Sequence, residues 1–114
     1  MTITVRMSTY RFDPAKRTEH AELRAKKRTL WAEALTREPG YLGEICVEAG
    51  EDRQVVLHFW SSAEMADAAL ARNNPRLRQL ISEHFLPDYD TLWTAPPEHL
   101  MGTLLTNTFS QGRA

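Results

Sequence analysis

Residues 54–60 read Gln-Val-Val-Leu-His-Phe-Trp, a stretch rich in β-branched and aromatic side chains that predicts a strand. Alternate side chains of a strand point to opposite faces of its sheet. One face of this strand carries Val55, Leu57 and Phe59, and the other carries Val56, His58 and Trp60. Neither face resembles a solvated surface. Because helices can cover one face only, we expect a second copy of the chain, related by a two-fold axis, to cover the other.

The remaining patterns place this strand in a single α+β domain. They predict, in order, a strand over residues 2–12, a helix over residues 14–37, strands over residues 41–48 and 54–60, a helical region between residues 61 and 95 that breaks at residues 73–75, and a strand over residues 100–106. This order is the split βαβ arrangement, a ferredoxin-like fold with both helices on one face of an antiparallel sheet. We expect one domain over residues 1–107 and a C-terminal tail over residues 108–114.

Capping and turn residues mark the boundaries of these elements. Asp13 before Pro14 is typical of a helix N-cap with proline at the first helical position. Glu38-Pro39-Gly40 ends the first helix, because proline restricts the residue before it and glycine tolerates the turn. In Ser61-Ser62-Ala63-Glu64 a hydroxyl N-cap is followed three residues later by a glutamate, which predicts a capping box.

Charge and cysteine content exclude several classes of partner. The 14 basic and 15 acidic side chains give a formal net charge of -1, so no net field attracts nucleic acid or acidic membranes, and we expect neither as a partner. The single cysteine, Cys46, rules out an internal disulfide, and no Cys/His cluster has the spacing of a structural zinc site. The N-terminus alternates, and no long apolar run occurs, so we expect a soluble, cytoplasmic protein.

Three segments carry a family resemblance: the alternating first strand, residues 37–43 (REPGYLG) and residues 58–64 (HFWSSAE). Together with the Asn74-Pro75 break, they resemble the antibiotic biosynthesis monooxygenase family of the dimeric α+β barrel superfamily, over roughly residues 2–106. The resemblance implies a homodimer whose sheets form a barrel, with a pocket between the sheet and the helices of each subunit. Members of the family include cofactor-free oxygenases that act on polyketide-like phenols, and haem-degrading enzymes.

Two functional patterns of that family differ in this chain. In the haem-degrading branch an asparagine on the first strand works with the tryptophan after the third strand and a histidine on the second helix. Here Trp60 matches, and the first strand has no asparagine. In some oxygenases of the family an asparagine precedes this tryptophan by four residues, at the position that Val56 occupies here. The resemblance therefore specifies the fold more closely than the activity.

Cofactor-free oxidation of an electron-rich phenol or anthrone needs a base, because the deprotonated, carbanion-like substrate is the species that can transfer an electron to oxygen. His58 is the first catalytic candidate, since its strand parity places it beside Val56 and Trp60. Trp60 could stack on a planar substrate. The alternatives are a hydrogen-bonded structural histidine and a tryptophan that anchors the following helix through its buried area.

The helices supply further candidates. His84 falls in the apolar stripe of the second helical region, so we expect its ring to point inward, either as a second catalytic base or bonded to a carbonyl at the edge of the core. Asn73 could donate its amide to a substrate oxygen, although capping of the helix break explains it as well. Phe85 and, from the first helix, Trp31 are expected to line the substrate pocket or to pack in the core.

Two other features of the sequence are not assigned to a ligand or catalytic site. The basic run formed by Arg24, Lys26, Lys27 and Arg28 is flanked by acidic side chains and spread around a helix, which is typical of a solvated surface. Cys46 has no proximal base in the sequence and is expected to pack in a buried position.

These observations favour a homodimeric, cofactor-independent monooxygenase that uses no metal and oxidises a planar aromatic metabolite of polyketide or quinol type. Two alternatives stay open. One is a non-catalytic homodimer that binds a small molecule or has a structural role, and the other is a haem-binding protein.

Overall fold

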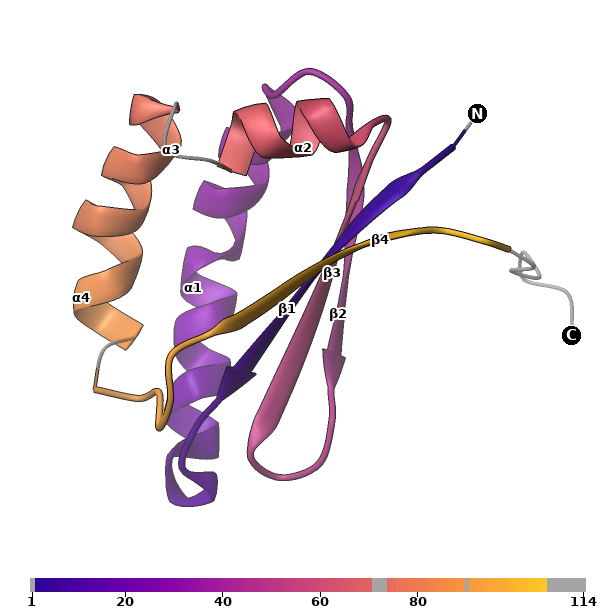
Figure 1. Cartoon of the computed structure of the whole chain (residues 1–114). Coiled ribbons are helices and arrows are strands. Elements are labelled where there is room, and N and C mark those ends of the chain that lie inside the picture. Colours follow the sequence, from indigo (N-terminus) through magenta and orange to yellow (C-terminus); the bar gives the residue numbers. More distant parts are fainter. Residues whose placement is uncertain (1, 71–73, 90, 107–114) are drawn as a thin grey trace, which may run out of the picture.

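The chain forms a four-stranded antiparallel sheet with its helices on one side (Figure 1). The computed structural model describes residues 2–70, 74–89 and 91–106. The strands are β1 (Thr4–Arg11), β2 (Tyr41–Glu48), β3 (Arg53–Trp60) and β4 (Glu98–Thr103), and their order across the sheet is β2-β3-β1-β4. The ferredoxin-like α+β fold predicted from the sequence is therefore confirmed.

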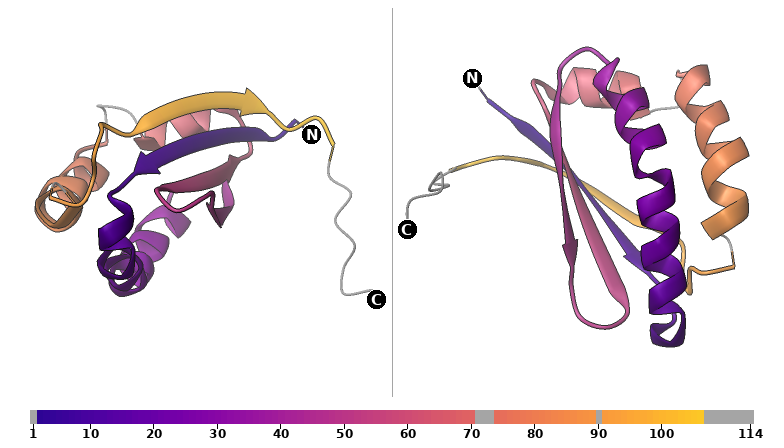
Figure 2. Two further views of the ribbon diagram at one scale, coloured as in Figure 1. Left: turned by 90° about the horizontal axis from the view of Figure 1, so that it is seen from below. Right: turned by 180° about the vertical axis from the view of Figure 1, so that it is seen from behind.

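Helices cover one face of this sheet, as both views in Figure 2 show. They are the 3-10 turn η1 (Pro14–Lys16), α1 (Arg17–Thr36), α2 (Ala63–Leu70), α3 (Pro75–Leu80), the π-helical turn η2 (Ile81–Phe85) and α4 (Leu86–Tyr89). The last three follow one another without a gap. The predicted tail over residues 108–114 lies outside the described residues, and the domain boundary at residue 107 stays a prediction.

The predicted cap at Asp13 is confirmed, Asn74 caps α3, and the cap predicted at Ser61 is displaced by one residue. Asp13 Oδ1 accepts a hydrogen bond from the Ala15 amide at 2.9 Å, and the Asn74 side chain accepts from the Leu77 amide at 3.1 Å. At α2 the Met65 amide donates to Ser62 Oγ at 3.1 Å, so the capping hydroxyl belongs to Ser62. The capping box predicted over residues 61–64 is therefore wrong in its register.

The second helical region ends earlier than the sequence pattern predicts. Its last helical residue is Tyr89, and Trp93 already bridges to Phe12 at the end of β1. The Thr94 amide donates to the Arg11 carbonyl at 2.9 Å. This bridge brings the chain back to the edge of β1 early, so the last strand covers Glu98–Thr103 instead of residues 100–106.

The two apolar faces predicted for β3 are both present. Toward the helices the buried residues of β3 are Gln54, Val56, His58 and Trp60. The opposite face carries Val55, Leu57 and Phe59, next to Ile45 and Val47 of β2 by the strand register. On this outer face Val47 is 43% exposed and Leu100 of β4 is 64% exposed. The described residues of a single chain leave this outer face without a cover.

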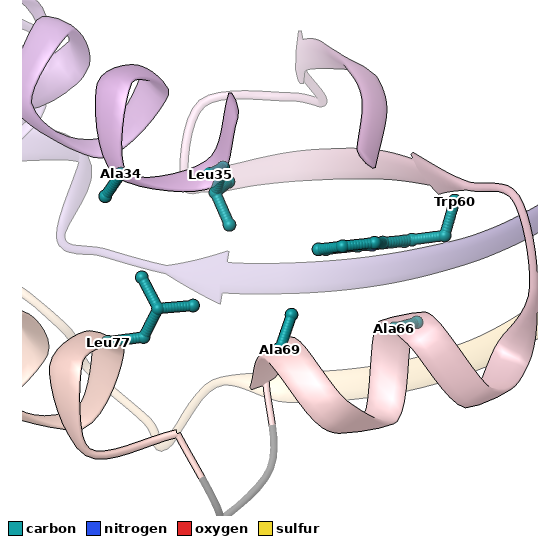
Figure 3. Packing of buried hydrophobic residues seen from close by; sticks show 6 residues of the cluster. All are labelled: Ala34, Leu35, Trp60, Ala66, Ala69 and Leu77. Carbon is teal, nitrogen blue, oxygen red and sulfur yellow. The ribbon is translucent and has the colours of Figure 1, made fainter. Parts of the chain in front are cut away.

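The main hydrophobic core lies at one end of the helical side (Figure 3). It consists of Ala34, Leu35, Trp60, Ala66, Ala69 and Leu77. Trp60 and Leu35 are fully buried, and the alanines of α2 leave room for the indole ring. Burial of one such indole removes on the order of 200 Å² from water, so Trp60 holds α2 against the end of β3.

An aromatic cluster closes the other end of the helical side. The ring of His20 on α1 stacks on Phe12 with centroids 4.2 Å apart and meets the edge of Tyr89 at 5.6 Å. Tyr89 in turn stacks on Trp93 at 5.2 Å. The sheet and helices are therefore packed together at two ends, and the space between these ends is what holds the site described below.

A side chain at position 40 should lower the stability of the fold measurably. The φ of Gly40 is 79°, and a Cβ added there would overlap the Met65 sulfur of α2. We expect Gly40→Ala to lower the free energy of unfolding by about 1–3 kcal/mol in urea denaturation, through backbone strain and displacement of Met65. Gly50→Ala is the control, because its φ is also positive at 82° and its added Cβ meets nothing closer than 3.9 Å. Equal losses in both variants would contradict the steric part of this account.

The buried His20 should make the folded chain less stable at acid pH. Burial, followed by the positive charge of Arg24, lowers the pKa of His20 below its ordinary value of 6.5. The unfolded chain therefore binds the proton first, and stability falls as pH drops below about 6.5. We expect His20→Phe, which keeps a ring against Phe12, to lose less thermal stability than the parent between pH 7.5 and 5.5. Parallel losses in parent and variant would refute a role for His20.

Candidate functional site

A cavity of about 780 Å³ lies between the sheet and the helices, in the space between the core and the aromatic cluster. Its floor is the helix-facing side of β1, β2 and β3, and its roof is α1 together with η2 and α4. Cavities of this size are typical of sites for small organic ligands. The family resemblance predicted a pocket in this position.

Strand register places three functional side chains in one row across the floor. Glu44 of β2 pairs with His58 of β3, and His58 pairs with Arg6 of β1. All three line the cavity. Directly paired residues of antiparallel strands have Cβ atoms about 4.5–5.5 Å apart, so a carboxylate, an imidazole and a guanidinium are held side by side by the backbone itself.

His58 has two polar neighbours at the same ring nitrogen. Its Nε2 lies 3.1 Å from Glu44 Oε2 and 3.4 Å from Trp31 Nε1 of α1. An imidazole nitrogen accepts when it is unprotonated and donates when it is protonated. Nε2 can therefore accept from the Trp31 N–H in the neutral ring and donate to Glu44 in the charged ring. Both forms of His58 have a partner at Nε2.

The electrostatics of the pair follow from this contact. Glu44 has a lowered pKa, first because of its hydrogen bond with His58, and its side chain is 29% exposed. His58 itself is 4% exposed, and its Nδ1 has no hydrogen-bond partner in the described part of the chain. The carboxylate is thus ionised at neutral pH and available to stabilise an imidazolium.

Aromatic rings form the roof of the cavity, as the sequence predicted for Trp31 and Phe85. Both side chains line it, and their rings meet edge to face with centroids 5.3 Å apart and planes inclined by 71°. Ring faces and edges of this kind contact planar aromatic ligands through large apolar areas. The structure brings these two residues and His58 together around one space.

Trp60 is not part of this space. The prediction that it lines the pocket is wrong, because the indole is fully buried in the core among Ala66 and Ala69. Strand parity did place Trp60 on the same face as His58, but α2 packs over the end of β3 and covers it. The alternative weighed for this residue, an anchor for the following helix, is the one observed.

His84 also lies elsewhere than expected. Its side chain is 48% exposed and its Nε2 is 3.9 Å from Glu83, so the prediction that its ring points inward is wrong. The π turn of η2 inserts a residue, which rotates the following positions by about 100° relative to an α-helix. Phe85 faces the cavity as a result, and His84 does not line it. Asn73, the remaining candidate, lies outside the described residues.

Charged residues that sequence reasoning had set aside line the cavity. Arg24, Lys27 and Arg28 of α1 belong to the basic run that was interpreted as a solvated surface, and all three contribute to the cavity wall. Arg24 Nη1 donates to Gln54 Oε1 at 3.0 Å. Cys46 lines the cavity as well and is exposed, which corrects the expectation of a buried thiol. Partial desolvation by the cavity wall raises the pKa of that thiol, so it is not an activated nucleophile.

Two further polar residues, Tyr10 and His99, line the cavity, and the buried Ser8 holds His99 in place. Ser8 Oγ and His99 Nδ1 form a hydrogen bond of 2.8 Å between β1 and β4. Burial, followed by the charge of Arg6, lowers the pKa of His99, which keeps this imidazole neutral at physiological pH. Burial raises the pKa of Tyr10, so its phenol stays protonated and can donate a hydrogen bond.

The described part of the chain offers neither a grouped set of metal ligands nor a membrane-spanning helix. Within residues 2–70, 74–89 and 91–106, no three His, Cys, Asp or Glu side chains are grouped to hold a metal ion. Of the helices that the structure describes, none has the length and apolar character needed to cross a membrane.

Comparison with known proteins places the fold among solved oxygenases. No protein-family model matches the sequence, and no curated protein matches it. The monooxygenase ActVA-Orf6 of Streptomyces coelicolor, solved with nanaomycin D, is 18% identical over 96% of this chain and 94% of its own, with a TM-score of 0.70. SnoaB, a cofactor-independent oxygenase from Streptomyces nogalater, is 18% identical over 99% and 100%, with a TM-score of 0.55.

A protein of unknown function from Nitrosomonas europaea is equally distant, at 18% identity over 98% of both chains and a TM-score of 0.67. Sequence identities of this size establish a shared fold and leave the chemistry to the residues of the site. The chain has the fold of the antibiotic biosynthesis monooxygenases, as its sequence resemblance predicted.

Proposed function

We propose that this chain is a cofactor-independent monooxygenase that oxidises a planar aromatic metabolite of polyketide or quinol type, with His58 as the base. The observation that carries the proposal is the placing of His58 Nε2 between an N–H donor and a carboxylate, in the wall of an aromatic cavity. Trp31 serves the neutral ring and Glu44 serves the protonated ring, which is the arrangement that proton uptake requires.

The reaction balances without a cofactor. An acidic ring carbon or hydroxyl of the substrate loses its proton to His58 Nε2, and the anion transfers one electron to O₂. Substrate radical and superoxide combine to a peroxide anion, which takes the proton back from His58. Loss of water from the resulting hydroperoxide leaves the new carbonyl. Each turnover consumes one O₂ and releases one H₂O.

The cavity walls support this chemistry in two ways. Trp31 and Phe85 offer apolar ring surface to a planar substrate and keep water away from the delocalised anion. The charge of Glu44 holds the imidazolium in place while the anion reacts with oxygen. Among structures of the same fold, ActVA-Orf6 is a monooxygenase solved with the ligand nanaomycin D and SnoaB is a cofactor-independent oxygenase. These two proteins of the same fold favour the same reaction class here.

Oxygen uptake with a panel of anthrones and hydroquinones tests the proposal. We expect His58→Ala to lower the rate by about 100-fold or more, since general base catalysis contributes at least that factor. Glu44→Gln should also lower the rate, because the amide does not stabilise the imidazolium. His84→Ala is the matched control, and its rate should equal that of the parent, because this histidine is exposed outside the cavity.

No uptake by the parent with any substrate of the panel would reject the oxygenase. Equal rates for the parent and His58→Ala would reject the base. Recovery of a bound aromatic metabolite unaltered after aerobic incubation would instead establish the non-catalytic binding protein.

We further propose that the chain works as a homodimer joined through the outer face of the sheet. That face presents the row Val55, Leu57 and Phe59, together with exposed Val47 and Leu100, and no helix of the described chain covers it. An apolar sheet face of this kind is self-complementary about a two-fold axis. Pairing of two such sheets would bury it without any further partner.

The dimer predicts a thermal transition that depends on protein concentration, since association stabilises the folded chain by mass action. The parent Tm should rise with concentration. Leu57→Lys should lower Tm and remove this dependence, because a lysine in the centre of the outer face opposes pairing. Ala32→Lys, at an exposed position of α1, is the control, and its Tm should still rise with protein concentration. A parent Tm that is the same at all concentrations would contradict the dimer.

A further inference from the structure

Arg6 is a cation in the floor of the cavity whose guanidinium has no hydrogen-bond or ion-pair partner among the described residues. It lies in the middle of β1, with His58 on one side and Met101 on the other by strand register. Its side chain is partly buried and lines the cavity. Across residues 2–70, 74–89 and 91–106 its guanidinium makes no hydrogen bond and no ion pair. A partly buried arginine with five unused donors is costly to keep.

The carboxylates of the cavity are already engaged elsewhere. Glu44 Oε2 bonds to His58 at 3.1 Å, and Glu48 Oε1 accepts from Arg17 at 2.6 Å. Burial lowers the pKa of Arg6, and the opposing influence of Tyr10 and Asp67 does not offset this. An arginine stays charged even so. The guanidinium groups that line the cavity are those of Arg6, Arg24 and Arg28, whereas both carboxylates of the lining already have partners.

From this imbalance we propose that the substrate carries a carboxylate, which Arg6 binds through its guanidinium. The proposal rests on the function proposed above and names the class of substrate, a planar aromatic carboxylic acid. A planar guanidinium and a planar carboxylate form two parallel N–H···O bonds, which suits a flat ligand held under the rings of Trp31 and Phe85. A carboxylate also supplies the anionic partner that Arg6 lacks within residues 2–70, 74–89 and 91–106.

The position of Arg6 gives this contact a role in orientation. Arg6 and His58 are directly paired across β1 and β3, with Cβ atoms about 4.5–5.5 Å apart. A carboxylate held by Arg6 therefore brings the neighbouring part of the aromatic ring system next to His58 Nε2. Arg6 thus acts as a binding and positioning residue, and His58 receives the proton.

Isothermal titration calorimetry with two probes of nearly the same shape, one anionic and one neutral, tests the proposal. The probes are anthraquinone-2-carboxylate and anthraquinone-2-carboxamide, which are already oxidised and so report binding without turnover. We expect the parent to bind the acid about tenfold or more tightly than the amide, since a charge-assisted pair is worth at least that factor. In Arg6→Gln this preference should disappear, while the amide binds as it does to the parent.

Two variants control for charge and for folding. Arg37→Gln removes one positive charge at an exposed position outside the cavity and should keep the full preference. Arg6→Lys retains the charge without the paired donors and should keep part of the preference for the acid. This variant tests the carboxylate site if Arg6→Gln does not fold. Equal affinity of the parent for acid and amide, or an unchanged preference in both Arg6 variants, would overturn the carboxylate site and leave the aromatic cavity standing. Failure of both probes to bind the parent would overturn the proposed function with it.

Discussion

The alternation of side chains along β3 determines which residues face the helices and which face outward, and both the cavity and the outer face follow from it. A strand has two faces, and β3 carries apolar residues on both. Its helix-facing side buries His58 beside the cavity and Trp60 in the core, and its outer side presents Leu57 and Phe59 away from every helix. A shift of one residue in register would exchange these roles. The position of the proposed base and the surface proposed for dimerisation are therefore set together.

The cavity exists because the helices touch the sheet at its ends. The core around Trp60 fixes α1, α2 and α3 at one end, and the stack of His20 on Phe12 fixes the start of α1 at the other. Between these contacts the helix-facing side chains of the sheet are largely polar, including Arg6, Ser8 and Glu44. Such residues are too few and too charged to fill the space as an apolar core would.

Local pattern and turn chemistry predicted most of the fold, because caps such as Asp13 and the alternation of β3 act over a few residues. Sequence reasoning also placed His58, Trp31 and Phe85 around one space. It misplaced Trp60 and His84, since the first depends on where α2 packs and the second on a π turn that no local pattern signals. It missed Glu44 and Arg6 because strand pairing, not sequence spacing, brings them beside His58.

The proposed pairing of two sheets can be tested by sedimentation equilibrium of the unmodified chain over a wide range of dilution. If both faces of β3 are apolar, its outer face must be shielded from water. If the outer faces of two sheets pair, a species of twice the chain mass persists at low micromolar concentration. A monomer of full stability at every concentration would contradict the pairing, since Leu57 and Phe59 would then face solvent at no cost.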